Sequence, residues 1–309
     1  MNAPSRTFAA QRILACVAEG ATSDHAVRAA AAIAERTGAQ LDLLHVVPPI
    51  LVGPTTFAGL SSENLSRQRA EQAQQSIAAH LSHRHADVRV AGRPLSDLLT
   101  VSVGSPARVV LDRARESACD LLVVGDSGKR KQLDLGGLAR ALYARAECPV
   151  WTQVEPPRAI ERVLVPIDLS ESSRGVLAYA LSLARTMNAR LHVLECFVRP
   201  ELFYGAGTDV PAGPLPYTID SLRNVEYEAF GRFVEEFDWQ GVQHSAEFVD
   251  DDPARAILSA QDRFQVIVMG THGRSALAAA LLGSVTWQVL RLARTPVLTV
   301  HDKGRSFAL

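Results

Sequence analysis

The sequence DPARAILSAQDRFQVIVMGTHG, residues 252–273, follows the same pattern as SPARVVLDRARESACDLLVVGDSG, residues 105–128. Each copy joins an amphipathic segment with helical spacing to a run of aliphatic residues that ends in glycine. A continuous run of β-branched residues is typical of a strand that is covered on both faces of a parallel sheet. The pattern therefore predicts a helix followed by a buried strand, and it predicts this unit twice.

Two further segments are repeated in the same order. RILACVAEG (12–20) corresponds to RVLVPIDLS (162–170), and ARALYARAECPVWTQV (139–154) corresponds to TWQVLRLARTPVLTV (286–300). Repeats that keep their order over half a chain indicate a duplicated domain rather than chance similarity. We therefore expect two domains of the same fold.

The boundary between the repeats falls at EPPRAIER (155–162), where two prolines interrupt regular structure. This predicts a first domain over 1–156 and a second over 157–309, and a chain of 309 residues is long enough for both. Each repeat reads β-α-β-α-β-α-β-α-β. Strands that alternate with helices predict an α/β fold, here two tandem doubly wound, Rossmann-like domains with parallel sheets.

The overall charge and hydropathy exclude several classes of function. The 32 Lys and Arg residues nearly balance the 33 Asp and Glu residues, so no global field favours nucleic acid or an anionic membrane. The first residues lack the pattern of a signal peptide, and no segment is apolar over the length that spans a bilayer. We predict a cytoplasmic protein that binds neither nucleic acid nor membrane.

The four cysteines stand singly, without CxxC spacing. They are Cys16, Cys119, Cys148 and Cys196. This pattern predicts free thiols, mostly buried, in a reducing compartment.

Glycines cluster where the strand at 266–270 ends. Gly270 and Gly273 permit a close approach of a ligand to the backbone, and Gly283 with Ser284 precedes the next predicted helix. Free N–H groups and the helix dipole at a helix start favour an anion. Ligands of open parallel sheets bind beyond the carboxyl ends of the strands, so these residues predict a phosphate site.

The spacing Gly270-x2-Gly273-x9-Gly283-Ser284 resembles the ATP-binding signature of the universal stress proteins, which are small α/β domains often found in tandem. The resemblance covers the chain in two copies and implies an adenine-nucleotide-binding, stress-response regulatory module with ATP as ligand. The nucleotide would bring its own Mg²⁺. The binding residues that the resemblance implies are Pro166, Ile167, Asp168, Cys196, Met269, Gly270, His272, Gly273, Arg274, Gly283, Ser284 and Val285.

The resemblance implies that different residues contact different parts of the nucleotide. Asp168 would face the adenine, and Cys196 would present a small side chain to the adenine edge. The turn 269–274 would contact ribose and phosphates, and the amides of 283–285 would donate to the phosphates. An alternative interpretation is that Asp168 caps the following helix.

The N-terminal half departs from this signature. Ala18 stands where the second repeat has Asp168, and we align Gly137 and Leu138 with the glycine and serine at the second phosphate turn, so that Leu138 replaces Ser284. Leucine offers no hydroxyl group. We therefore expect that the N-terminal half lost nucleotide binding and serves as a scaffold.

Three functions remain open on the sequence. The first is an ATP-binding regulator in which nucleotide orders the long loop 199–218. The second is a slow ATPase or autokinase that modifies Ser275 or Ser284, although no residue is assigned a catalytic role. The third is an interaction or scaffold protein that needs no nucleotide, in which the glycines are inherited geometry.

Two further features concern metals and partners. His80, His83 and His85 have a spacing that a transition metal could use, but without another ligand they predict a solvated helix end and no metal site. The resemblance implies that the final strands of the repeats, 149–154 and 296–300, pair within the chain, since universal stress domains commonly pair through their last strands, and this would cover two sheet edges. A homodimer and a protein partner of unknown identity follow by analogy alone.

Overall fold

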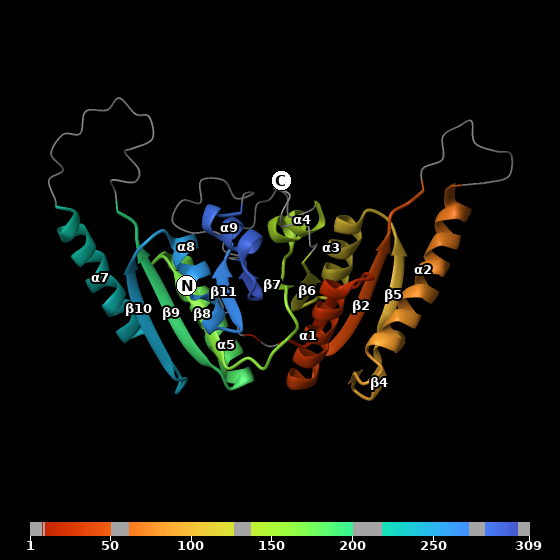
Figure 1. The fold of residues 1–309 in the computed structure, drawn as a ribbon, viewed down its shortest axis with the longest axis horizontal. Helices are drawn as coiled ribbons and strands as arrows, with labels where there is room; N and C mark the ends of the chain where they lie inside the picture. The colour runs from red at the N-terminus through yellow and green to blue at the C-terminus, as the bar shows by residue number, and fades with distance from the viewer. Residues whose placement is uncertain are drawn as a thin grey trace, which may run out of the picture.

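The computed structural model describes residues 8, 10–50, 62–126, 137–199, 218–271 and 282–301. Ten of its strands form one sheet in the order β10-β9-β8-β11-β12-β7-β6-β1-β2-β5 (Figure 1). The strands from β1 to β7 belong to the N-terminal half and those from β8 to β12 to the C-terminal half. The predicted loop 199–218 lies, for residues 200–217, outside the described part of the chain.

The predicted alternation of strands and helices is confirmed in both halves. The N-terminal half contains β1 (Arg12–Cys16), α1 (Ala21–Thr37), β2 (Gln40–Val47), α2 (Ser62–Arg84), β3 (Arg89–Val90), β4 (Arg93–Pro94), the 3₁₀ turn η1 (Leu95–Leu98), β5 (Leu99–Val103), α3 (Pro106–Glu116), β6 (Leu121–Gly125), α4 (Gly137–Arg145) and β7 (Val150–Gln153).

The C-terminal half repeats the order of the α-helices and of the strands of the large sheet, without the β3–β4 hairpin and with its 3₁₀ turn at a different place. It contains β8 (Arg162–Ile167), α5 (Glu171–Met187), β9 (Arg190–Phe197), α7 (Ile219–Glu236), β10 (His244–Asp250), α8 (Pro253–Ala260), the 3₁₀ turn η2 (Gln261–Arg263), β11 (Val266–Gly270), α9 (Ser284–Leu292) and β12 (Val297–Val300).

Within each half all strand pairs of the large sheet are parallel. In each half the first strand lies at the centre, and the chain first winds outward from it and then returns to its other side. The strand order therefore reverses between β1 and β6 and between β8 and β11. In a doubly wound sheet this is the point where the carboxyl ends of the strands leave a crevice for a ligand.

The two halves join through their last strands. β7 and β12 pair antiparallel, with Trp151 opposite Leu298 and Val150 opposite Thr299. The predicted pairing of the final strands within one chain is confirmed. Each strand covers an edge that would otherwise offer unpaired backbone groups to another chain. In Figure 1 the halves lie on either side of this join, and α2 and α7 lie on the outer flanks.

The helices form a layer on each face of the sheet. One hydrophobic cluster contains residues of α1, α2, α5 and α7, and the other contains residues of α3, α4, α8 and α9. Alternate residues of one strand enter different clusters: Val163 and Val165 belong to the first and Leu164 to the second. This burial on both faces explains why the strands read as continuous apolar runs. Both clusters include residues from both halves.

Side chains reinforce the join on the α4 and α9 face. The Thr299 hydroxyl donates to the Val150 carbonyl at 3.3 Å, and His301 Nε2 donates to the Tyr143 carbonyl at 2.8 Å. The guanidinium of Arg140 on α4 lies 5.1 Å from the ring centre of Trp287 on α9.

The opposite face is held by the N-terminal segment and by α1. Phe8 is buried and meets Tyr179 of α5 edge-on, with ring centres 5.7 Å apart. The Ser182 hydroxyl donates to the Phe8 carbonyl at 3.3 Å, and Arg36 Nε donates to the Thr186 carbonyl at 3.0 Å. The two halves therefore share backbone, core and polar contacts.

The histidines at the end of α2 are not the solvated helix terminus that the sequence predicts. His80 Nε2 donates to Asp24 Oδ1 at 2.7 Å, His85 Nε2 donates to the same oxygen at 3.1 Å, and Arg84 Nε lies 3.4 Å from Oδ2. His85 is only 2% exposed, whereas His83 is exposed. These contacts clasp the start of α1 to the end of α2.

The contacts of Asp24 with His80 and His85, which we call the histidine–aspartate clasp, make the stability of the protein fall as the pH drops. Burial acts to raise the pKa of Asp24, but the hydrogen bonds from His80 and His85 outweigh it, so the pKa is lowered. Burial is also the main cause that lowers the pKa of His85, against the opposing effect of Asp24. A lowered histidine pKa means that the unfolded chain binds the proton first, so stability falls as pH drops below about 6.5. The Asp24 contribution is lost only in stronger acid, below its ordinary range.

We predict that His85→Gln reduces the loss of stability between neutral pH and about pH 5, because it removes a group that the unfolded chain protonates near pH 6.5. The measurement is the thermal midpoint of the full chain at both pH values. His83→Gln, an exposed change on the same helix turn, serves as the control and should follow the wild type. Equal acid sensitivity in all three proteins would contradict the assignment.

Candidate functional site

The candidate site lies at the carboxyl ends of β8 and β11, which are neighbours at the point where the strand order reverses. Asp168 follows β8 directly, and Gly270 is the last residue of β11. Since carboxyl ends of parallel strands share one sheet edge, the structure brings these two predicted residues to the same edge.

Asp168 is organised by the first turn of α5. Its Oδ1 accepts hydrogen bonds from the Ser170 amide at 3.1 Å, the Ser170 hydroxyl at 2.5 Å and the Ser173 hydroxyl at 2.7 Å. Ser173 Oγ also accepts from the Asp168 amide at 3.2 Å. The alternative interpretation that Asp168 caps the following helix is wrong, because the N-cap of α5 is Ser170 and no side chain of the described residues accepts from the amides of the first turn. The carboxylate is held in place at the sheet edge, and its contact with adenine stays a prediction.

The start of α9 is fixed to the end of β11 by two hydrogen bonds. The Gly283 amide donates to the Thr271 carbonyl at 2.8 Å, and the Thr286 hydroxyl donates to the Gly270 carbonyl at 2.8 Å. In this structure the Gly283 N–H is used to hold the start of α9 to Thr271, and its donation to a phosphate stays a prediction. The first-turn amides of Ser284 and Val285 are the remaining predicted donors, since such groups lack an acceptor within their helix.

Three further predicted residues lie on the α8 and α9 face of the sheet. Met269 belongs to the hydrophobic cluster of that face, and Cys196 and Val285 pack against it while partly exposed. Burial raises the pKa of the Cys196 thiol to about 12, so the side chain is neutral. Pro166 is half-buried on β8, and Ile167 belongs to the opposite cluster. Cys196, Met269 and Val285 therefore lie on one face of the sheet, whereas Ile167 lies on the other.

Several predictions lie outside the described residues. His272, Gly273, Arg274 and Ser275 fall in the segment 272–281 and are not placed. Within the described ranges, the structure contains no group of three or more His, Cys, Asp or Glu residues that could hold a metal ion. It also shows, over the same ranges, no helix of the length and hydropathy needed to cross a membrane.

The N-terminal half has the same backbone-to-serine hydrogen bond at the end of its first strand, but it lacks the carboxylate. We call this shared arrangement the frame of the site. The Ala18 amide donates to Ser23 Oγ at 2.8 Å, as the Asp168 amide donates to Ser173 Oγ. A Cβ on Gly125 would lie 2.6 Å from the Thr22 carbonyl oxygen, so the glycine is required by the close approach of α1.

The predicted alignment of the second phosphate turn is wrong by one residue. α4 begins at Gly137 and α9 at Ser284, and both helices are nine residues long. Gly137 therefore corresponds to Ser284, and Leu138 corresponds to Val285. The segment between Gly125 and Gly137 is shorter than the segment between Gly270 and Ser284. An alignment counted from Gly128 is therefore shifted by one residue. The hydroxyl is still missing from the N-terminal half.

Sequence reasoning missed Ser173 and Thr286, which position the two ends of the site. Ser173 had a visible signal, because Ser23 stands at the same place in the first repeat. Thr286 had no such signal, because its role depends on the distance between the start of α9 and the end of β11.

The fold and the duplicated frame define a tandem doubly wound α/β protein. The family described as the universal stress protein family matches residues 9–152 and again 159–301. A universal stress protein of Mycolicibacterium smegmatis is 28% identical over 304 residues, covering 94% of this chain and 97% of that protein. A universal stress protein of Mycobacterium tuberculosis is 30% identical over 224 residues, covering 69% and 71%.

The solved structure of a universal stress protein from Archaeoglobus fulgidus shares the fold, with a TM-score of 0.64 at 15% identity. The alignment covers 95% of this chain and 99% of that one. The chain belongs to the universal stress protein family.

We predict that Ser173→Ala lowers the free energy of unfolding by about 1.5–3 kcal/mol, because it removes a hydrogen bond to a carboxylate and leaves the Asp168 amide without Oγ. The matched change Ser23→Ala should cost only about 1 kcal/mol, because Ser23 Oγ accepts from the Ala18 amide and there is no carboxylate for it to bond. Denaturant titration of the full-length variants measures both values. Equal losses would show that the Asp168 contacts add nothing.

Proposed function

We propose that the C-terminal half binds an adenine nucleotide, with ATP as the expected ligand, and that the chain is a nucleotide-dependent regulatory protein. The observation that carries the proposal is that Asp168 and the start of α9 lie at the same sheet edge. The N-terminal half has the same frame with Ala18 in place of the carboxylate.

The chemistry of these groups fits a nucleotide. A fixed carboxylate accepts hydrogen bonds from an amino or hydroxyl group of the base or ribose. The start of α9 offers backbone amides and a positive dipole end to phosphate groups, with the Ser284 hydroxyl as an additional donor. Cys196 and Val285, which are partly exposed on one face of the sheet, would offer apolar side chains to a planar base. When bound, the nucleotide would supply its own phosphate charge and the divalent cation that accompanies it.

Regulation would follow from differential affinity. A ligand shifts a conformational equilibrium only when it binds one state better than the other. Here the ligand would contact two elements, α5 and α9, whose starts lie at the same sheet edge. Because α9 lies beside the join with the N-terminal half, nucleotide would alter the surface around α4 and α9 that a partner protein could contact.

Hydrolysis of the bound nucleotide would be slow. Phosphoryl transfer needs an oriented water and a group that accepts its proton. Asp168 is the one carboxylate that the proposal places in the site, and its Oδ1 is engaged with three donors from the first turn of α5. Autophosphorylation of Ser284 or Ser275 belongs to the same slow chemistry.

A second candidate function is a protein-interaction module that needs no nucleotide. It is favoured by the closed hydrogen bonding of the site, where the Gly283 amide is bonded to Thr271 and the serines of α5 satisfy Asp168. In that case the frame of the site is purely structural, and a protein partner is the functional ligand.

Calorimetric titration of the full chain with Mg·ATP separates the two candidates. We predict one binding site per chain, and Asp168→Asn should weaken binding at least tenfold, which is about 1.4 kcal/mol. Asn keeps an Oδ1 acceptor for the serines, so the loss would not reflect misfolding. Titrations with ADP, AMP and cyclic AMP rank the nucleotides.

Glu19→Gln is the matched control, because Glu19 follows Ala18 at the corresponding edge of the N-terminal half. Its affinity should equal that of the wild type. A wild-type chain that carries no nucleotide after purification and gives no heat with any of the four ligands would favour the nucleotide-independent function instead.

A further inference from the structure

Two cysteines that are far apart in the sequence lie side by side at the amino edge of the N-terminal half. Cys119 precedes β6 by two residues and Cys148 precedes β7 by two residues. β6 and β7 are parallel neighbours with Leu122 opposite Val150, so the chain register places the cysteines within one residue of directly opposite positions. Neighbouring strands lie about 4.8 Å apart, which is within the Cα separation of about 4.4–6.8 Å that a disulfide requires.

The two thiols are near enough to influence each other. Cys119 Sγ donates to the Leu121 carbonyl at 3.1 Å. The neighbouring Cys148 thiol, together with burial, raises the pKa of Cys119 above its usual range. Cys119 therefore keeps its proton at neutral pH.

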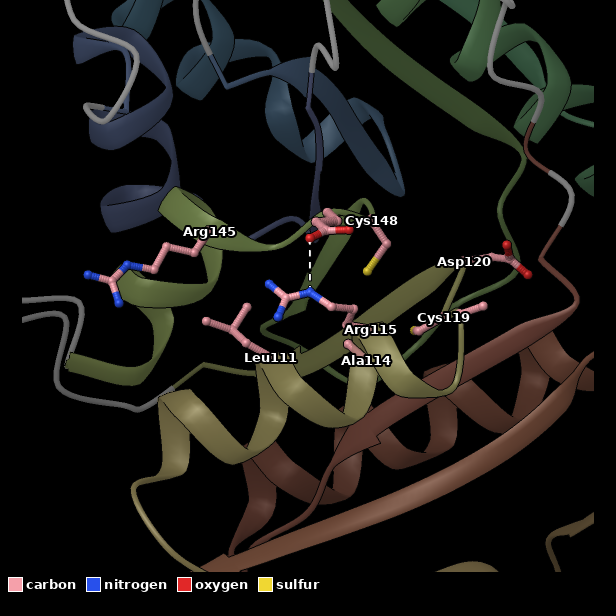
Figure 2. Close-up of a pocket in the computed structure, with 9 residues that line it drawn as sticks. Leu111, Ala114, Arg115, Cys119, Asp120, Arg145 and Cys148 are labelled. Atoms are coloured by element: carbon pink, nitrogen blue, oxygen red, sulfur yellow. Dashed lines mark hydrogen bonds and ion pairs between the residues drawn. The ribbon is translucent and has the colours of Figure 1, made fainter. Parts of the chain in front are cut away.

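A cavity of about 300 Å³ reaches this pair (Figure 2). It lies between the ends of α3 and α4, and Cys119, Cys148, Arg115 and Arg145 are among the residues that line it. Arg115 Nε lies 3.1 Å from Glu147 Oε1 at the cavity wall. Figure 2 shows the sulfur of Cys148 directed toward the space between Arg115 and Cys119. The cationic side chains of Arg115 and Arg145 favour the reactive thiolate, whereas the carboxylates of Glu147 and Asp120, which also line the cavity, oppose it.

The C-terminal half has a different arrangement at the corresponding place. Phe264 precedes β11 by two residues and Thr295 precedes β12 by two residues, and both are buried. Gln261 fills the region between them: its side chain accepts from the Thr295 amide, and its carbonyl accepts from the Thr295 hydroxyl. The thiol pair is therefore a feature of the N-terminal half alone.

We propose that Cys119 and Cys148 are a redox modification site that forms an intramolecular disulfide when the chain meets a peroxide. The Cys148 sulfur attacks one peroxide oxygen, the O–O bond breaks, and sulfenic acid and water (or an alcohol from an organic peroxide) are formed. The Cys119 thiol then attacks the sulfenic sulfur, loses its proton and releases water. The two thiols supply the two electrons that reduce the peroxide.

The disulfide would tie the turn before β6 to the turn before β7, next to the join of the two halves. A cross-link limits the unfolded chain, so oxidation should raise the stability of the protein. The reaction should be faster at higher pH, because the thiolate is the attacking form. This inference is independent of nucleotide binding and stands if the proposed function fails.

The test treats the full-length chain with hydrogen peroxide and maps its peptides by mass spectrometry without reduction. We expect a linked peptide containing Cys119 and Cys148, lighter by two hydrogens than the separate peptides, and restored to both by dithiothreitol. Cys119→Ser and Cys148→Ser should each abolish it. Cys16→Ser and Cys196→Ser are the matched controls and should leave it intact.

Two outcomes would overturn the inference. One is a wild-type chain in which both thiols stay reduced at peroxide concentrations that oxidise Cys16 or Cys196. The other is separate oxidation of Cys119 and Cys148 to sulfinic acids with no linked peptide. Far-ultraviolet circular dichroism of each variant before oxidation shows whether its fold is retained. If a serine variant is unfolded, the peptide map of the wild type alone decides.

Discussion

The antiparallel pairing of β7 with β12 is the constraint on which the rest of the molecule depends. It turns two five-stranded sheets into one sheet and removes an exposed edge from each. Because the strands continue from one half to the other, the hydrophobic clusters on both faces also continue. The same pairing places α4 beside α9, where Arg140 stacks on Trp287. A change at the start of α9 therefore lies close to the other half of the chain.

The two halves use one frame for different chemistry. At the carboxyl edge, the C-terminal half holds a fixed carboxylate, Asp168, whereas the N-terminal half keeps only the supporting serine, Ser23. The N-terminal half instead carries a histidine–aspartate clasp around Asp24 and a pair of thiols at its amino edge. A duplicated α/β domain tolerates this divergence because its stability comes from the shared sheet, while the strand ends are free to vary.

The sequence was sufficient for the features that depend on local pattern and on repetition. The continuous apolar runs predict strands covered on both faces, and the repeated segments predict two doubly wound domains. The pairing of the last strands is implied by the resemblance to the universal stress proteins. The sequence failed where the answer depends on register or distance in space. The partnership of Cys119 and Cys148 requires knowing that β6 and β7 are neighbours, and the burial of His85 requires the crossing of α1 and α2. The misaligned Gly137 followed from counting across loops of unequal length.

Native-state hydrogen exchange of the backbone amides of β7 and β12 tests the central claim most directly. If the two strands form the interior of one sheet, their slowest amides should exchange only through global unfolding, at rates that match those of the central strands β1 and β8. β5 and β10, which end the sheet, supply the internal comparison for an edge strand. Exchange in β7 and β12 that is as fast as in β5 and β10 would contradict a continuous sheet and would separate the halves into independent units.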